Sequence, residues 1–130
     1  MRTTILTALI GATLVTGAAA TERTYGEADM PRIVDDSRNN ELRFNRDYKG
    51  QRLTFVGRFN GVTESLFGLR KHVTIKGFGP NGAYCFLDNA DPVLKRMIDW
   101  RRGQQINVSG TISTTMFGDV ALDDCSISSN

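Results

Sequence analysis

The stretch "YKGQRLTFVGRF", residues 48–59, decides the fold class because its side chains alternate in character. From position 52 onward, apolar or small residues occupy every second place. On one side these are Leu53, Phe55, Gly57 and Phe59, and on the other Arg52, Thr54, Val56 and Arg58. This period of two predicts a half-buried β-strand. The alternative, an exposed stripe of rings and charges, would need both on one face, and the spacing separates them.

The first 20 residues have the features of a secretory signal peptide. Arg2 precedes an apolar run from Ile5 to Val15, and the small residues 18–20 form a cleavage pattern. The run is too short to cross a bilayer, which takes roughly 20 residues, so we expect no membrane anchor. We predict cleavage after Ala20 and a periplasmic or secreted mature protein.

Residues 21–47 form a polar segment in which we predict one amphipathic helix, over residues 30–45. Pro31 suits the first turn of a helix, and Gly50 suits the turn that follows. A β-rich domain is predicted over residues 48–130.

Four more strands are predicted after the first, within residues 72–78, 83–87, 104–113 and 120–127. A helix is expected between the third and fourth strands, capped by Asp91 and stopped by Gly103. A bulge near Asp123 and Asp124 would reconcile the two phases of the last strand. The order is typical of a mainly β protein with a five-stranded OB-fold barrel, an N-terminal helix and a helix between strands 3 and 4.

Cys85 and Cys125 are the two cysteines of the chain. They fall on the third and fifth strands, which are neighbours in an OB barrel, so we predict a disulfide. The bridge would close a loop of about 40 residues and stabilise the fold by about 4 kcal/mol. A pair of free thiols is the alternative. We expect no metal site, because His72 is the single histidine and lies far along the chain from both cysteines.

The stretch "NNELRFNRDYKGQRLTFVGRFNGV" resembles the opening of the tRNA-anti-like family of small exported bacterial proteins. The matching positions are Asn40, Glu41, Tyr48, Lys49, Gly50 and Gly57, while Gln51 departs from the family's basic residue. "YCFL", "WRRGQQINVSGTI" and "VALDDCSI" resemble its later strands, so the likeness covers roughly residues 38–128. It implies an OB-fold and no catalytic residues.

The predicted binding surface is the face of strands two and three with the loops that frame it, where OB-folds bind their ligands. It comprises Phe67, Arg70, Lys71, His72, Lys76, Phe78, Tyr84, Met116 and Phe117. Rings beside cations suit an anionic or sugar-like ligand, single-stranded nucleic acid or a protein edge. The alternatives are that Phe67 and Phe117 fill the barrel ends and that His72 is a solvated strand histidine.

The balance of charge weighs mildly against nucleic acid. The net charge is +2, and loss of Arg2 with the leader leaves it near +1, whereas nucleic-acid binders usually carry a clear basic excess. We therefore expect a non-catalytic binding or interaction module with an unknown protein or envelope partner. The alternative is binding of single-stranded nucleic acid or another polyanion. The composition leaves the oligomeric state open.

An enzyme is the third hypothesis, a phosphodiesterase-like activity using Arg52, Arg58 and Asp119. Nothing in their spacing makes these three side chains converge. Asp91 is better explained as a helix cap than as half of a catalytic pair with Asp88. No cofactor is expected.

Overall fold

The structure is a computed structural model that describes residues 23–64 and 68–130, so the predicted signal peptide lies outside the described residues. The chain is mainly β, and the described residues form one six-stranded sheet with few helices. In chain order the elements are β1 (Thr24–Tyr25), the 3-10 turn η2 (Glu27–Asp29), α2 (Met30–Asn39), α3 (Glu41–Asp47), β2 (Arg52–Glu64), β3 (Arg70–Lys76), β4 (Ala83–Asp88), α4 (Val93–Met97), β5 (Gln105–Met116) and β6 (Asp119–Ser129).

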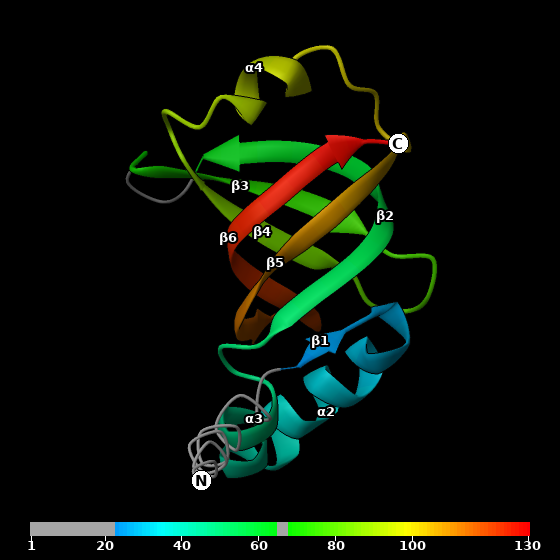
Figure 1. The fold of residues 1–130 in the computed structure, drawn as a ribbon, viewed down its shortest axis with the longest axis vertical. Helices are drawn as coiled ribbons and strands as arrows, with labels where there is room; N and C mark the ends of the chain where they lie inside the picture. Colours follow the sequence, from blue (N-terminus) through cyan, green and yellow to red (C-terminus); the bar gives the residue numbers. More distant parts are fainter. Residues whose placement is uncertain (1–22, 65–67) are drawn as a thin grey trace, which may run out of the picture.

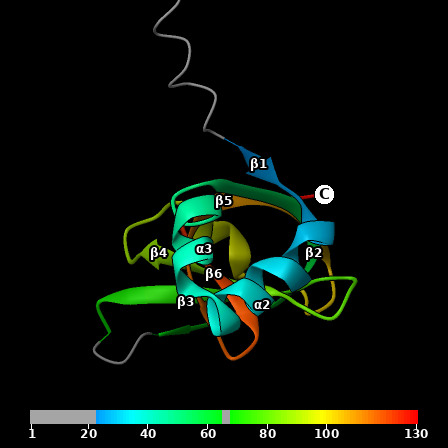
Figure 2. The same cartoon turned by 90° about the horizontal axis from the view of Figure 1, so that it is seen from below.

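The sheet closes on itself because β2 is long enough to pair with two neighbours. Its first half runs antiparallel to β5, with Leu53 opposite Gly110, and its second half antiparallel to β3, with Phe59 opposite Ile75. Pairing then continues from β3 to β4, in parallel from β4 to β6, and back to β5. Figure 2 shows the molecule from the end at which α2 and α3 lie, with the strands arranged around the centre. The five long strands match the predicted strands in order, and the short β1 is an addition that runs parallel to the start of β2.

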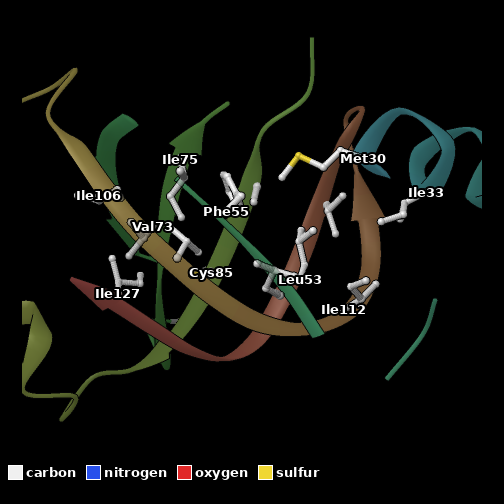
Figure 3. Packing of buried hydrophobic residues seen from close by; sticks show 14 of the residues in the cluster. Met30, Ile33, Leu53, Phe55, Val73, Ile75, Cys85, Ile106, Ile112 and Ile127 are labelled. Atoms are coloured by element: carbon white, nitrogen blue, oxygen red, sulfur yellow. The ribbon is translucent and has the colours of Figure 1, made fainter. Parts of the chain in front are cut away.

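The core lies inside the closed sheet and is filled by the alternating side chains that the sequence predicts. Leu53, Phe55 and Phe59 of β2 are buried, and they meet the buried side chains of the other strands. Figure 3 shows this packing, with Met30 and Ile33 of α2 entering from one end. Both residues are fully buried. The helices α2 and α3 therefore cover one end of the sheet, and α4 lies at the opposite end (Figure 1).

The single N-terminal helix predicted over residues 30–45 is wrong, because the chain forms two helices that meet at Asn40. The backbone of Asn40 leaves the helical region at φ −153° and ψ 79°. Its Oδ1 accepts a hydrogen bond from the amide of Arg43, so Asn40 caps α3. Across the break, Arg43 Nη2 lies 2.8 Å from Oδ1 of the buried Asp36. The break thus lets α3 turn back and neutralise a carboxylate of α2.

The predicted helix that ends at Gly103 is also wrong in length, since α4 spans only Val93–Met97. The chain beyond it is drawn back to the sheet: the Gly103 amide donates to the Phe59 carbonyl, and the Phe59 amide donates to the Gln104 carbonyl. The Trp100 ring packs edge-on against Phe59, with ring centroids 5.5 Å apart. These long-range bonds compete with further helical turns. None of the described helices is both long and apolar enough to cross a membrane.

Four strands, β2, β4, β5 and β6, are longer than predicted, and the extensions of β2 and β5 shorten the neighbouring loops. β2 continues beyond the predicted strand to Glu64, because a register shift between Phe59 and Gly61 lets residues 61–64 pair with β3. β5 continues to Met116, which leaves Phe117 and Gly118 as a tight turn between β5 and β6. Both turn residues have positive φ, 51° and 83°, as the two-residue hairpins that suit twisted strands require.

The predicted disulfide is confirmed, and so is the predicted bulge. Cys85 of β4 and Cys125 of β6 are bonded, with Cα atoms 6.0 Å apart. On β6 the register shifts so that two residues, Asp124 and Cys125, lie opposite Gly110, and Asp124 takes a φ of 49°. The extra residue reverses the alternation of β6 and brings Cys125 to the inner side, where Cys85 lies.

Candidate functional site

The outer face of β3 and β4 carries polar and aromatic side chains, and the inner face is core. Val73 is opposite Cys85 on the inside, whereas His72 is opposite Phe86 and Thr74 opposite Tyr84 on the outside. The outer residues are only partly buried, so their side chains reach solvent. The strands themselves are held by the closed sheet, which makes this a rigid surface for ligand contact.

Three rings form a row across this face. The His72 ring lies between those of Tyr84 and Phe86, with centroids 5.9 Å away in each case and the ring planes steeply inclined. His72 is therefore packed between two aromatic rings and is not a freely solvated strand histidine. Burial, with a smaller contribution from Asp119, raises the pKa of Tyr84, so its phenol is neutral at physiological pH.

Cations border both ends of the aromatic row. At one end, the Arg70 guanidinium lies 5.0 Å from the centre of the Phe86 ring, and its Nη2 also contacts Asp123 at 2.8 Å. At the other end, the Arg58 guanidinium lies 4.9 Å from the centre of the Phe78 ring, and its Nη2 donates to the Gly77 carbonyl. Each arginine is thus positioned by a ring and a hydrogen bond.

A polar cleft of about 380 Å³ opens at the Phe78 end of the face. Arg58, Thr74, Lys76, Tyr84 and Asp119 line it together with Gly77 and residues 79–82 of the following loop. The tight turn between β5 and β6 is attached to the same loop. Asn81 Nδ2 donates to the Gly118 carbonyl, and the Gly82 amide donates to Asp119 Oδ1.

The structure brings together most of the predicted surface. Arg70, His72, Lys76 and Tyr84 share the outer face, with Phe78 at its end and, attached to the same loop, the turn that follows Met116 and begins with Phe117. Phe117 is 91% exposed, so it does not fill a barrel end. Phe67 lies outside the described residues.

Lys71 is separated from this face. It points to the opposite side of β3, pairs with Glu64 at 2.7 Å and lines an apolar hollow beside α4. The period-two rule assigns it to the inner side, and its neighbours Arg70 and His72 to the outer one.

Two residues that matter for this surface were missing from the prediction, Phe86 and Arg58. The signal for Phe86 was present, since it follows Tyr84 by two places in "AYCFL" and so shares its face. Arg58 was correctly assigned to the outer side of its strand, but only the curvature of β2 brings it to the Phe78 loop.

The carboxylates considered for catalysis are held by structural hydrogen bonds. Asp91 accepts from the Val93 amide, and Asp88 from the Ala90 amide. Asp119 accepts from the Gly82 amide. Arg52 bonds to Ser109 and Thr111 and does not line the cleft that contains Arg58 and Asp119. Within residues 23–64 and 68–130, no group of three or more potential metal ligands is found.

Comparison with solved structures places the chain among proteins of similar fold. It is similar to a Klebsiella pneumoniae protein provisionally described as a nucleic acid-binding lipoprotein, with a TM-score of 0.58, 14% identity, and coverage of 86% of this chain and 96% of that one. It is also similar to an OBody bound to hen egg-white lysozyme, with a TM-score of 0.46, 15% identity, and coverage of 63% and 85%.

A chain of a replication protein A heterotrimer bound to single-stranded DNA gives a TM-score of 0.41 at 16% identity, with coverage of 62% of this chain and 57% of that one. Neither the models of known protein families nor the curated proteins match this sequence. The likeness to the Klebsiella protein is one of fold, and that fold is OB-fold-like.

Proposed function

We propose that this protein is a non-catalytic OB-fold module that binds single-stranded nucleic acid on the outer face of β3 and β4. The observation that carries the proposal is the row of rings formed by Tyr84, His72 and Phe86, bordered by Arg70 at one end and by the Arg58 cleft at the other. In OB-folds this face, the second and third strands of the barrel, is the usual place for oligonucleotides. The fold of the Klebsiella lipoprotein adds support.

Two further parts of the proposal concern fold and location. The strands β2, β3, β4, β6 and β5 pair in a closed circuit, since β5 also pairs with β2. This circuit supports a five-stranded OB barrel of the kind that the tRNA-anti-like resemblance implies. Export by the signal peptide at residues 1–20 is supported by the disulfide between Cys85 and Cys125, because such bonds persist in oxidising compartments. The ligand would then be extracellular or periplasmic.

Stacking, more than charge, would supply the affinity. A base stacked on an aromatic side chain contributes about 1–3 kcal/mol. The cations near the face are few, and Arg70 already pairs with Asp123. If Arg58, Arg70 and Lys76 each neutralise one phosphate, the logarithm of the affinity falls with the logarithm of salt concentration at a slope of about −2. This is a shallow dependence for a nucleic-acid binder.

The test is fluorescence anisotropy of mature protein with a labelled dT oligonucleotide of about a dozen nucleotides, at several salt concentrations. Tyr84→Leu and Phe86→Leu keep apolar bulk and remove the ring, so each should weaken binding by about five- to tenfold. Tyr25→Leu removes a half-buried ring near the N-terminus and serves as the control, with affinity unchanged. Equal affinity of all four proteins, or no binding at low salt, would refute the proposal.

The non-catalytic part of the proposal has its own test. It is supported by the structural hydrogen bonds of Asp88, Asp91 and Asp119. Incubation of labelled single-stranded DNA and RNA with protein and Mg²⁺ should leave both intact. Cleavage that is lost in Asp119→Asn would instead establish a phosphodiesterase-like enzyme.

A protein partner is the second candidate, and a different surface favours it. An apolar hollow of about 530 Å³ beside α4 is lined by side chains that include Phe59, Leu94 and Met97. Ile98 borders it and is 80% exposed. Cross-linking in an envelope extract, with Ile98→Asp as the comparison, tests this candidate. A partner lost in that variant supports it, and an identical set of partners argues against it.

A further inference from the structure

The carboxylate of Glu27 sits on two consecutive backbone amides of the loop between β3 and β4. Both the Phe78 and the Gly79 amide donate to the same oxygen, Oε2, at 2.6 Å each. Glu27 belongs to η2, which precedes α2, so the contact joins the N-terminal segment to a loop some 50 residues later in the chain. Both hydrogen bonds are exposed to solvent.

The loop is shaped for this close approach of an anion. A Cβ atom on Gly77 would lie 2.4 Å from the Asn81 carbonyl oxygen and 2.8 Å from Glu27 Oε2, so only glycine fits there. Successive amides that converge on one oxygen are the arrangement by which backbones bind phosphate and carboxylate groups. The site therefore selects for a charged oxygen, and in this protein the occupant is part of the chain.

Cations lie beside the two amides. Arg58 donates to the Gly77 carbonyl and packs on the Phe78 ring, and Lys76 directly precedes the loop. Both line the polar cleft that also contains Gly77 and Gly79. Asp119 lines it as well, with its Oδ1 bound to the Gly82 amide. The cleft adjoins Tyr84, the first ring of the aromatic row. The amide pair therefore lies where a nucleic-acid strand bound along that row would end.

We propose that the amides of Phe78 and Gly79 form a phosphate-binding subsite that Glu27 occupies until a phosphate group displaces it. Met30, three residues beyond Glu27, is fully buried and anchors the N-terminal segment. Glu27 can therefore leave the amides by rotation of its own side chain, without movement of the segment. The identity of the phosphate as part of a nucleic-acid strand rests on the proposed function. The subsite itself does not.

The test reads the subsite directly, from the backbone amide NMR signals of Phe78 and Gly79 during titration with inorganic phosphate. In Glu27→Ala both signals should shift saturably, with an apparent affinity at least about tenfold higher than in the wild type. Glu41→Ala removes an exposed carboxylate of α3 and changes the net charge equally, so it should behave like the wild type. Equal responses in Glu27→Ala and Glu41→Ala would show a general effect of charge and overturn the proposal.

A second variant covers the case in which the loop opens once Glu27 is truncated. Glu27→Gln keeps a neutral oxygen on the amides, so it holds the loop and should still bind phosphate more tightly than the wild type. If neither variant shows a saturable response at Phe78 and Gly79, the subsite does not exist.

An oligonucleotide titration separates this inference from the proposed function. Glu27→Ala should bind the dT oligonucleotide about tenfold more tightly than Glu41→Ala if the strand supplies the phosphate. Phosphate binding at the two amides without any oligonucleotide binding keeps the subsite and overturns the proposed function. Oligonucleotide binding without an amide response keeps the function and overturns the subsite.

Discussion

The sulfur of Cys125 lies directly above Gly110, so closely that a Cβ atom on that glycine would be 2.9 Å from Sγ. The same Cβ would lie 2.9 Å from Leu122 Cβ and 3.2 Å from the Asp123 carbonyl oxygen. The β6 bulge that places Cys125 for its disulfide therefore requires a residue without a side chain on the facing strand. The position of the Cys125 sulfur on β6 thus depends on a glycine at position 110 of β5.

Gly110→Ala should consequently destabilise the fold by about 1–3 kcal/mol, the usual cost of overpacking a filled interior. Chemical denaturation of the purified variant measures the loss. Gly26→Ala is the matched control, because a Cβ there has an ordinary 3.8 Å contact and the backbone is extended. Similar free energies of unfolding for both variants would mean that β6 can move away from Gly110 freely.

Removal of the disulfide should cost about 4 kcal/mol in the chain-entropy description, since the bridge closes a sequence separation of 40 residues. We expect the double variant Cys85→Ala with Cys125→Ala to be less stable than the oxidised protein by this order. Unfolding curves of the wild-type protein, measured once without reductant and once with it, give the same comparison without a mutation. Coincident curves, with reduction verified by mass, would contradict the expectation.

Asp36 should make the fold sensitive to acid. The hydrogen bond from Arg43 holds the pKa of this carboxyl below its ordinary value. The unfolded chain then takes up the proton more readily than the folded one, so the stabilisation is present above about pH 4 and is lost as pH falls below it. Melting temperatures from about pH 5 to about pH 2 should fall less steeply in Asp36→Asn than in the wild type. Asp35→Asn, on the exposed side of α2, should keep the steep profile.

Phe117 is costly to the fold in its present conformation. It has a φ of 51° at the first position of a two-residue turn, where asparagine is preferred, and its ring is almost fully exposed. Phe117→Asn should therefore stabilise the protein by about 1 kcal/mol. Phe117→Ala removes the ring but keeps the backbone strain, so it should gain little. A melting temperature of Phe117→Asn at or below that of Phe117→Ala would refute the strain argument.

Local pattern in the sequence was sufficient for the strands, their inward faces and the disulfide. Leu53, Phe55 and Phe59 alternate with outward-facing residues, and such alternation follows from the geometry of a strand alone. Cys85 and Cys125 could be paired because the order of strands makes their strands neighbours. The bulge near Asp124 was predictable from alternation as well, because the apolar residues before and after it in the last strand fall on opposite phases.

Tertiary contacts decided the rest, because they depend on residues far apart in the chain. Asn40 breaks a helix so that Arg43 can reach Asp36, and the bonds of Gly103 and Gln104 to Phe59 shorten α4. Curvature of β2 brings Arg58 to Phe78, and folding of the N-terminal segment brings Glu27 to the same loop. Periodicity reports which side a residue faces. Which distant group it meets there is determined only when the sheet closes and its ends are covered.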